Sequence, residues 1–311
     1  MKPEADGYVP FSQRLAAWWH GEEVGPKIVK GANSRKVDIA VESEPVAVSR
    51  WSDIGINIAG RLWGTGLSEP GGLAYWDKVV VPAGPNGAMT ILAICPGLCG
   101  GLRHFVKKYD LWLNALEQEE ELFEAAYDLN AQAGMQQRIN LNRVDLGEVE
   151  LPDKTHDLVF SREAFYRIEA KERLLTRIAE SLKPGGHLVF TDLVADGDDL
   201  ASPELTACRD KEPGIDTIWN EARYRQILDA QKMEVHVVID ESEEYNEMIL
   251  HGWQALQESL ARDSGLSRTY VDALMREAQI WLARSRAIQA GRLRLIRVHG
   301  RRKKLRRTSQ Q

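Results

Sequence analysis

The stretch ILAICPGLCGG, residues 91–101, is a hydrophobic run that breaks into a glycine-rich turn. Residues 89–95 (MTILAIC) are typical of a buried strand, and GGLRHFVKKY at 100–109 is typical of a helix that begins on the glycines. A strand, a glycine turn and a helix together place backbone N–H groups and a helix N-terminus against a ligand. Tight turns need glycine for backbone reasons alone, so this stretch indicates a fold before it indicates a ligand.

The same alternation continues along the chain. Strand patterns follow at 111–116, 139–145, 156–161 and 187–193, and helix patterns at 118–134 and 171–182, the second stopped by KPGG. Strands that alternate with helices indicate an α/β fold with a doubly wound, mostly parallel sheet. In such sheets the ligand lies at the carboxyl ends of the strands, near the point where the strand order reverses.

Helical segments are expected on both sides of this core. Residues 11–23 and 53–64 have helical spacing, a Gly/Pro turn at 67–72 precedes a further helix, and 37–48 is a short strand or an extended arm. Further helices are expected around Ile227, Trp253 and Trp281. We therefore expect an N-terminal arm and helical cap (1–82), a core (83–200), a C-terminal part with the rest of the sheet plus helices (201–300) and a disordered basic tail (301–311).

The composition of the chain limits the kinds of partner and the cellular compartment that we expect for it. The 311 residues are 43% hydrophobic, and no stretch reaches the ~18 consecutive apolar residues of a membrane span. The start of the sequence does not resemble a signal peptide, and three cysteines make no even disulfide framework, so we expect a reducing cytoplasm. Nine Lys or Arg and no acids lie in 292–311, which leaves the rest of the chain strongly acidic. An acidic body argues against a nucleic-acid enzyme, and we expect a small-molecule substrate.

Acidic and polar residues follow successive strands at their carboxyl ends. Glu117 ends the second strand, where a carboxylate can accept hydrogen bonds from ribose hydroxyls. Asp145 and Leu146 follow the third strand, and Ser161 and Glu163 follow the fourth. Each acid alone is equally typical of a solvated loop or a helix cap. Together they converge on one crevice and favour a nucleoside-like ligand.

With these residues placed, the chain resembles class I S-adenosylmethionine-dependent methyltransferases, on the pairing of LPDKTHDLVFSREAFYRI (151–168) with LKPGGHLVFTDL (182–193). It is most similar to the phosphoethanolamine and sarcosine/dimethylglycine N-methyltransferase group, where LWGTGLSEPGG (62–72) stands in place of a glycine-rich element ahead of the core. The resemblance implies a seven-stranded Rossmann-like sheet and S-adenosylmethionine as cofactor. It implies that the methionine part of the cofactor lies near Gly71 and Gly72, and that Cys95, Gly97 and Gly100 of the first loop lie against the cofactor. It also implies that the ribose binds Glu117, that the adenine binds Asp145 and Leu146, and that Ser161 belongs to the same cofactor site.

The departures from the family pattern fall on the first loop and on the catalytic positions. The acid of the family's first loop becomes Ala93, and two of its glycines become Cys95 and Cys99. A Cβ at a glycine position with positive φ costs about 1–2 kcal/mol. The resemblance assigns catalytic positions to Trp51 (for a lid tyrosine), Glu163 and Arg167 (for a histidine). Arginine cannot act as a base at neutral pH, and tryptophan can stack on a cation but cannot relay a proton.

The sequence leaves several hypotheses open. Cys95 and Cys99 are expected to be buried small hydrophobic residues, with a redox pair as the alternative, and we expect no metal site because two thiolates do not supply four ligands. For function we expect methyl transfer to a small amine- or carboxylate-bearing metabolite. The alternatives are an inactive scaffold, assembly factor or ligand sensor with a protein partner, and a nucleic-acid methyltransferase that uses the basic tail.

Overall fold

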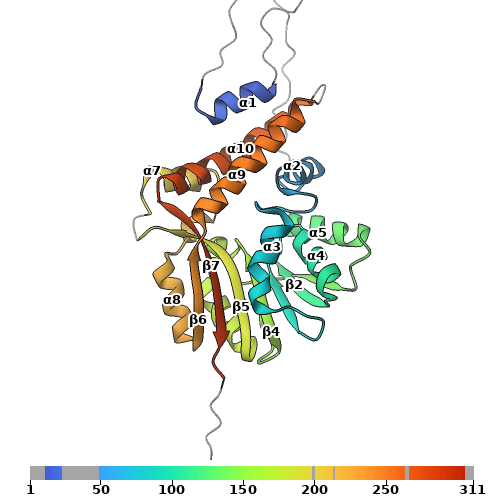
Figure 1. The fold of residues 1–311 in the computed structure, drawn as a ribbon, viewed down its shortest axis with the longest axis vertical. Helices are drawn as coiled ribbons and strands as arrows, with labels where there is room; N and C mark the ends of the chain where they lie inside the picture. The colour runs from blue at the N-terminus through green and yellow to red at the C-terminus, as the bar shows by residue number, and fades with distance from the viewer. Residues whose placement is uncertain (1–10, 23–48, 198–199, 213, 263–265, 305–311) are drawn as a thin grey trace, which may run out of the picture.

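The computed structural model describes residues 11–22, 49–197, 200–212, 214–262 and 266–304. The strand or arm expected at 37–48 lies outside these residues, as do positions 305–311 of the basic tail. Figure 1 shows the fold as a twisted sheet with helices packed around it and a group of helices at one end.

Seven strands form one sheet in the order β3-β2-β1-β4-β5-β7-β6. Neighbouring strands from β3 to β5 are parallel, and β7 runs antiparallel to both β5 and β6. This confirms the doubly wound, mostly parallel seven-stranded sheet. The strands are β1 (Ile91–Ile94), β2 (Leu113–Glu117), β3 (Ile139–Arg143), β4 (His156–Arg162), β5 (Leu182–Ala195), β6 (Met233–Asp240) and β7 (Leu293–Arg302).

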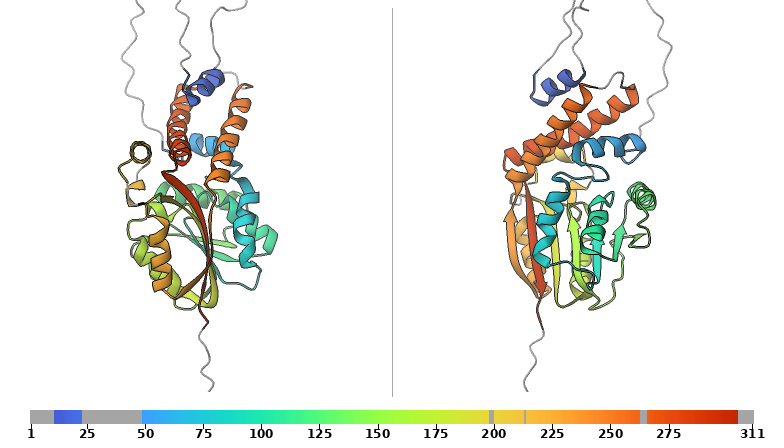
Figure 2. Two further views of the ribbon diagram at one scale, coloured as in Figure 1. Left: turned by 60° about the vertical axis from the view of Figure 1, so that its left-hand side comes forward. Right: turned by 45° about the vertical axis from the view of Figure 1, so that its right-hand side comes forward.

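Helices cover both faces of the sheet, as the turned views in Figure 2 show. Those that precede β5 are α1 (Phe11–Trp19), α2 (Asp53–Trp63), α3 (Gly72–Val80), α4 (Gly100–Tyr109), α5 (Glu120–Gln132) and α6 (Lys171–Ser181). Those that follow it are α7 (Pro203–Arg209), α8 (Glu221–Ala230), α9 (Ser242–Leu260) and α10 (Arg268–Gln289). Short 3-10 helices are η1 (Val81–Ala83), η2 (Phe165–Arg167) and η3 (Ile215–Thr217). The helices expected around 11–23, 53–64, 100–109 and 118–134 are confirmed.

The core is divided by the sheet, because successive side chains of a strand point to opposite faces. On β1, Ile91 and Ala93 pack into one apolar cluster with α3 and α4, whereas Leu92 and Ile94 pack into a second with α6 and α8. All four side chains are at least 96% buried. A strand that is buried on both faces has a continuous run of apolar residues in the sequence. Residues 89–95 could therefore be recognised as a strand although apolar and polar residues do not alternate there.

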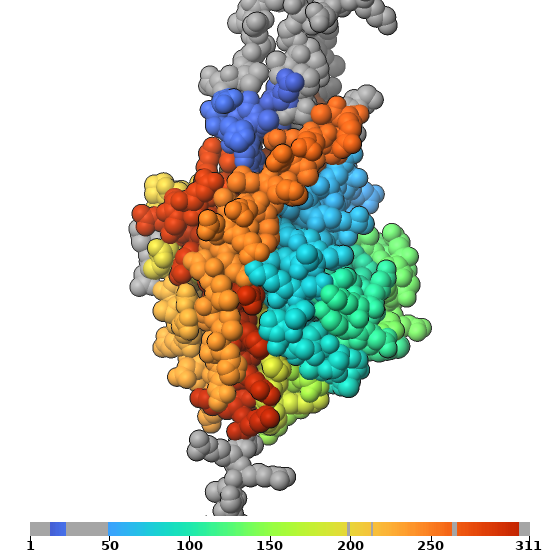
Figure 3. Space-filling view, in the orientation of Figure 1, coloured from blue at the N-terminus to red at the C-terminus, as the bar shows by residue number. Residues whose placement is uncertain are grey.

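Four helices gather at one end of the sheet. Trp19 of α1 stacks on Trp253 of α9 with ring centroids 4.9 Å apart, and Trp63 of α2 meets Trp281 of α10 at 4.7 Å. These contacts confirm that the AWWHG segment is a packed helix. Figure 3 shows α9 on the surface between the N-terminal helices and the C-terminal part of the chain. Within the described ranges, every helix is too short or too polar to cross a membrane.

Two boundaries expected for the C-terminal half are wrong, although the strand at 187–193 is confirmed. The strand expected at 187–193 is the longer β5, which already begins at Leu182 and includes the KPGG sequence, with a register shift where it pairs with His156 of β4. The basic tail expected from 301 begins later, because Arg301 and Arg302 belong to β7. Their guanidinium groups donate to the carbonyl of Gly185 (2.8 Å) and to carbonyls at the end of α6. Arginine side chains thus satisfy carbonyls that a helix leaves open at its C-terminus.

Candidate active site

The first loop connects β1 to α4 and is built from residues in the left-handed region. Cys95, Gly97 and Cys99 have φ of 45°, 59° and 60°. The two cysteines therefore adopt the backbone conformation for which the sequence pattern would place glycine, and each is strained by about 1–2 kcal/mol. Cys99 is the N-cap residue of α4 and offers no side-chain cap.

The two cysteines lie on different sides of the sheet. Cys95 belongs to the apolar cluster that contains Leu92 and Ile94, and Cys99 belongs to the cluster that contains Ala93. Both are free thiols and are at most 2% exposed. Burial raises the pKa of Cys95 well above its ordinary value and raises the pKa of Cys99 to about 12. This confirms the interpretation of buried small hydrophobic residues and gives no support to a redox pair.

Glu117 lies at the carboxyl end of β2 and is completely buried. Its Oε1 accepts hydrogen bonds from the backbone N–H groups of Gln118 (2.9 Å) and Glu119 (3.1 Å). Its Oε2 is buried and has no hydrogen-bond partner in the described part of the chain. Burial raises the pKa of this carboxyl, and Arg167 opposes that rise. A buried carboxylate oxygen without a donor is unfavourable, so this atom is suited to a hydroxyl group of a ligand.

A cleft of about 960 Å³ opens beside Glu117. Arg143, Asp145 and Arg167 contribute to its wall. Asp145 is exposed, and its Oδ1 accepts from the N–H of Gly147 at 2.8 Å. The structure brings together Glu117, Asp145 and Arg167 of the predicted residues. Clefts of 300–1,000 Å³ are typical of small-molecule and cofactor sites.

Two predicted cofactor residues lie beside this cleft but within the core. Leu146 is 1% exposed and packs in the same apolar cluster as Cys95. Ser161 is also buried, and its hydroxyl donates to the carbonyl of Ile94 on β1 at 3.0 Å. Both positions support the walls of the site, and their contact with a cofactor stays a prediction.

The segment 66–70 lies directly on the first loop. The carbonyl of Gly66 accepts the N–H of Gly100 at 2.9 Å, and a Cβ on Gly100 would lie 2.2 Å from that oxygen. A Cβ on Gly97 would lie 2.1 Å from Ser68 Oγ and 2.7 Å from Glu69 Oε1. Both glycines are therefore required by the chain's own packing.

Gly71 and Gly72 follow that segment at the start of α3, with φ of 98° and 59°. The space behind Gly71 is closed by Tyr75 and by Met248 of α9, whereas nothing comes nearer than 4.0 Å at Gly72. Ser68 and Glu69, which precede the two glycines, lie against Gly97 of the first loop. The predicted carboxylate site at Gly71 and Gly72 stays a prediction.

Arg167 and Trp51 are joined through Glu119. The Trp51 Nε1 donates to Glu119 Oε1 at 2.7 Å, and the Arg167 Nη1 lies 3.7 Å from Glu119 Oε2. Burial lowers the pKa of Arg167, but Tyr166, Cys95 and the two glutamates raise it overall, so the guanidinium stays charged. Arg167 lines both the cleft and a second, smaller cavity on its other side.

This second cavity has a volume of about 30 Å³ and is bordered by Trp51, Glu69, Glu163 and Arg167. That volume holds about one water molecule. Buried charges occupy the surrounding space. Glu163, with φ of 46°, binds Arg162 at 3.1 Å and accepts the hydroxyl of Tyr245 at 2.5 Å. The structure thus brings the three predicted catalytic residues to the wall of one cavity.

Behind Glu163, α10 carries a buried ion pair. Arg284 Nε donates to Glu212 Oε2 at 2.8 Å, and its Nη2 donates to the hydroxyl of Tyr166 at 2.7 Å. The Tyr166 hydroxyl in turn donates to Glu212 Oε1 at 2.5 Å. Burial opposes the charged form of Glu212, but Arg284 lowers the pKa of that carboxyl to about 2.

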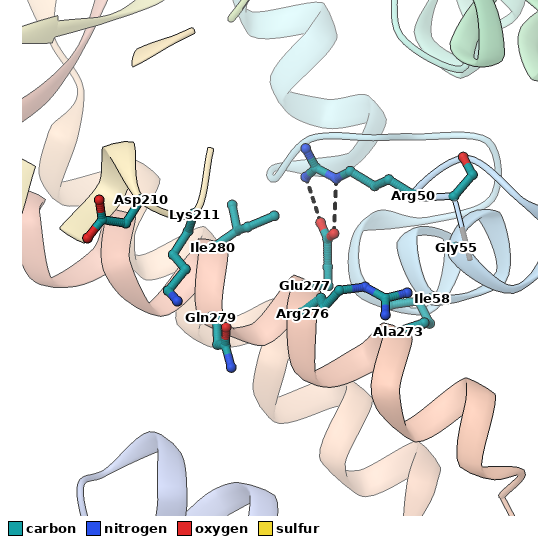
Figure 4. A pocket seen from close by; sticks show the side chains of 11 residues that line it. Arg50, Gly55, Ile58, Asp210, Lys211, Ala273, Arg276, Glu277, Gln279 and Ile280 are labelled. Atoms are coloured by element: carbon teal, nitrogen blue, oxygen red, sulfur yellow. Dashed lines mark hydrogen bonds and ion pairs between the residues drawn. The ribbon is translucent and has the colours of Figure 1, made fainter. Parts of the chain in front are cut away.

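A surface pocket of about 270 Å³ is lined by residues of α2 and α10 and by Asp210 and Lys211, which follow α7 (Figure 4). Its inner wall is the ion pair in which Arg50 Nε and Nη2 donate to the Glu277 carboxylate at 3.0 and 2.7 Å. Arg50 also lines the small cavity, and the Nε1 of Trp281 donates to Glu277 at 2.7 Å. Arg50 therefore borders both the surface pocket and the cavity.

Comparison with known proteins agrees with this geometry. Residues 96–190 match the family model described as a methyltransferase domain. Over these residues, about a third of the chain, the sequence is similar to methyltransferase domains. It is 23% identical over 218 residues to phosphoethanolamine N-methyltransferase 3 of Arabidopsis thaliana, which covers 63% of this chain and 44% of that protein. Over 70 residues it is 37% identical to dimethylglycine N-methyltransferase of Parasynechococcus marenigrum, which covers 22% of this chain and 25% of that protein.

Among solved structures, phosphoethanolamine N-methyltransferase 2 of Haemonchus contortus in complex with S-adenosyl-L-methionine has a TM-score of 0.71 at 19% identity, over 82% of this chain and 58% of that one. This likeness shows that the fold is the methyltransferase fold. The chain spans less than half the length of the Arabidopsis relative. The expected recognition of the family and of the fold is confirmed.

Sequence reasoning missed several residues of the candidate site. Glu119 stands in the run EQEEEL, where neighbouring acids suggest a solvated helix start. Ser68 and Glu69 precede Gly71 and Gly72, the two glycines to which the family motif draws attention. The role of the remaining members is indicated by no local pattern: Glu212 follows α7, and Tyr245, Glu277 and Arg284 lie on α9 and α10.

The described residues fit an adenosine group better than they fit the rest of the cofactor. Glu117 offers an unpaired buried oxygen and Asp145 an exposed carboxylate in a roomy cleft. At the first loop, by contrast, Ala93 supplies no charge, and Glu69 stands over Gly97. No group of three or more His, Cys, Asp or Glu in the described ranges is arranged to hold a metal ion.

Proposed function

We propose that this protein binds S-adenosylmethionine and transfers its methyl group to a small amine- or carboxylate-bearing metabolite. The observation that supports it most strongly is the buried, unpaired Oε2 of Glu117 at the carboxyl end of β2, beside the cleft of about 960 Å³. An oxygen in this position is suited to a ribose hydroxyl, and Asp145 in the same cleft is suited to the adenine amine. The cofactor would supply a methyl group on a positively charged sulfur.

On the substrate side, the chain contributes positioning rather than acid–base chemistry. Arg167 is charged and cannot remove a proton, and its planar guanidinium is suited to a carboxylate or phosphate of the acceptor. Trp51 presents an aromatic face that can lie against a cationic group. Both Glu163 oxygens are already engaged by Arg162 and Tyr245. The acceptor amine would therefore enter in its neutral form, with desolvation and alignment providing the rate.

An acceptor larger than a water molecule needs more room than the 30 Å³ cavity gives. Arg50, whose guanidinium pairs with Glu277, lines both the surface pocket in Figure 4 and that cavity. We propose that the acceptor enters from this pocket when Arg50 and Trp51 move together. The Arg50 guanidinium lies 5.1 Å from the centre of the Trp51 ring, so the two side chains are already in contact.

Calorimetry with S-adenosylmethionine tests the proposal. We expect micromolar binding, weakened about 10- to 100-fold by Glu117→Gln, because that substitution removes the charged acceptor but keeps the side-chain size. Glu124→Gln is the matched control, since Glu124 lies on α5 and is exposed outside the cleft. Absence of binding at millimolar cofactor would refute the proposal. Turnover is then measured with a labelled methyl group on a panel of small amines and carboxylates.

The small cavity also supports a second candidate, a catalytically inactive ligand sensor or scaffold. Its surrounding charges are paired with one another, so the site is stable without an acceptor. Binding of the cofactor without turnover on any acceptor, in the wild type and in an Arg50→Ala variant that opens the pocket, would favour this alternative.

A further inference from the structure

One acid that lies against the first loop comes from outside the core. Glu69 belongs to the segment 66–70, which is fixed on the loop by the hydrogen bond from Gly100 N–H to the Gly66 carbonyl. The contact is close, because a Cβ on Gly97 would lie 2.7 Å from Glu69 Oε1. The loop's own strand offers no charge at Ala93 or Cys95. Glu69 therefore provides the negative charge that faces the backbone of Gly97.

The Glu69 carboxylate has room for another donor. Its Oε1 accepts from the Ser68 hydroxyl at 2.6 Å, and no described residue donates a hydrogen bond to its Oε2. The side chain is partly buried at the wall of the small cavity. Burial raises the pKa of Glu69, while the charge of Arg162 opposes the rise and that of Glu163 adds to it. A half-buried carboxylate with one neutral donor favours a cationic partner.

Glu69 and Glu117 lie near the same end of the loop. A Cβ on Gly97 would lie 2.7 Å from Glu69 Oε1, and Leu116, the residue before Glu117, accepts the N–H of Cys95 at 2.8 Å. Glu117 also faces the cleft, whereas Glu69 faces the small cavity. A ligand with an adenosine group at Glu117 and an amino acid group at its other end would extend past the loop towards Glu69.

We propose that Glu69 binds the α-ammonium group of the cofactor's amino-acid half, in place of an acid at the end of β1. This inference rests on the proposed function, because it concerns the same cofactor. It names a binding residue supplied by the segment before α3. A carboxylate at this position would instead repel the cofactor's own carboxylate if the amino-acid half were oriented the other way, and the experiment separates the two cases.

Three nucleosides serve as probes in calorimetry. S-adenosylhomocysteine carries both the ammonium and the carboxylate, its decarboxylated analogue 5′-deoxy-5′-(3-aminopropylthio)adenosine keeps the ammonium alone, and 5′-deoxy-5′-methylthioadenosine has neither. We expect Glu69→Gln to weaken binding of the first two by about tenfold or more and to change binding of the third by less than about twofold. Glu117→Gln should weaken all three, and Glu148→Gln, at an exposed pair with Arg173, should change none.

The outcomes distinguish this inference from the proposed function. If none of the three nucleosides binds the wild-type protein, the proposed function fails and this inference fails with it. If all three bind and Glu69→Gln affects none of them, or all of them equally, only this inference is wrong. Tighter binding of S-adenosylhomocysteine by Glu69→Gln would show repulsion instead. Unchanged thermal unfolding of the variant would confirm that it folds.

Discussion

The ion pair between Glu212 and Arg284 makes stability depend on pH in a calculable way. Their side chains are 7% and 4% exposed, and the pKa of Glu212 is lowered from 4.5 to about 2. One unit of pKa corresponds to 1.36 kcal/mol, so the ionised carboxylate stabilises the fold by about 3 kcal/mol at neutral pH. Because the folded-state pKa is the lower one, this contribution is complete above about pH 4.5 and is lost as the pH falls towards 2.

We therefore expect Glu212→Gln to lower the free energy of unfolding by about 3 kcal/mol at pH 7, since it leaves the Arg284 guanidinium buried beside Glu163 alone. The difference from the wild type should shrink as the pH falls below 4.5, because the wild-type carboxyl then becomes neutral as well. Urea unfolding, followed by tryptophan fluorescence between pH 7 and the lowest pH at which the wild type stays folded, measures this difference.

Glu150→Gln is the matched control, because Glu150 pairs with Arg177 on the surface with side chains 71% and 35% exposed. An exposed pair contributes at most about 1 kcal/mol, and we expect the control to change stability by less than that. A loss below about 1 kcal/mol for Glu212→Gln at pH 7, or a loss that does not depend on pH, would refute the reasoning. The buried pair would then be no more stabilising than its neutral replacement.

Two further predictions concern the first loop and α4. Gly101→Ala should destabilise the protein by at least about 1–3 kcal/mol, because the new Cβ would lie 2.0 Å from the Trp76 ring. Gly60→Ala is the control, because a Cβ at this position in α2 would have no atom nearer than 4.0 Å. We expect the control to be neutral or stabilising by up to about 1 kcal/mol in the same urea titration. An alkylating reagent should leave Cys95 and Cys99 unmodified in the folded protein and modify both in guanidinium chloride. A disulfide between them, detected by mass spectrometry after mild oxidation of the folded protein, would contradict their placement on opposite faces of the sheet.

The sheet could be predicted from the sequence because its central strands, such as β1 and β4, are buried on both faces and glycines mark the turns between elements. Residues 89–95 show this most clearly, since the strand and the helix start at Gly100 are local patterns. Glu117 and Asp145 could be placed in one cleft for the same reason, because parallel strands bring their carboxyl ends to one edge. The start of β5 was missed because the glycines in KPGG are more typical of a turn than of a strand.

The small cavity could not be predicted, because its walls come from segments far apart in the sequence. Glu163, Tyr245 and Arg284 meet only after α9 and α10 pack over the end of the sheet. Arginine is rarely buried unless it is paired, so a single sequence gives no reason to expect that an arginine in a helix is buried. Its partner Glu212 follows α7 and lies 72 residues away.

The charges around the first loop are rearranged rather than lost. Ala93 and Cys95 leave the loop neutral, but Glu69 brings a carboxylate to Gly97 from one side and Arg167 brings a guanidinium to Cys95 and Glu117 from the other. A cofactor with one cationic and one anionic group at its amino-acid end requires one charge of each sign nearby, and these two side chains supply them. Burial raises the pKa of both Glu69 and Glu117, the Arg167 guanidinium opposes each rise, and its removal would favour the neutral form of each. Cofactor affinity should therefore depend on Arg167 even if that residue never contacts the cofactor, because it favours the ionised form of two carboxylates beside one loop.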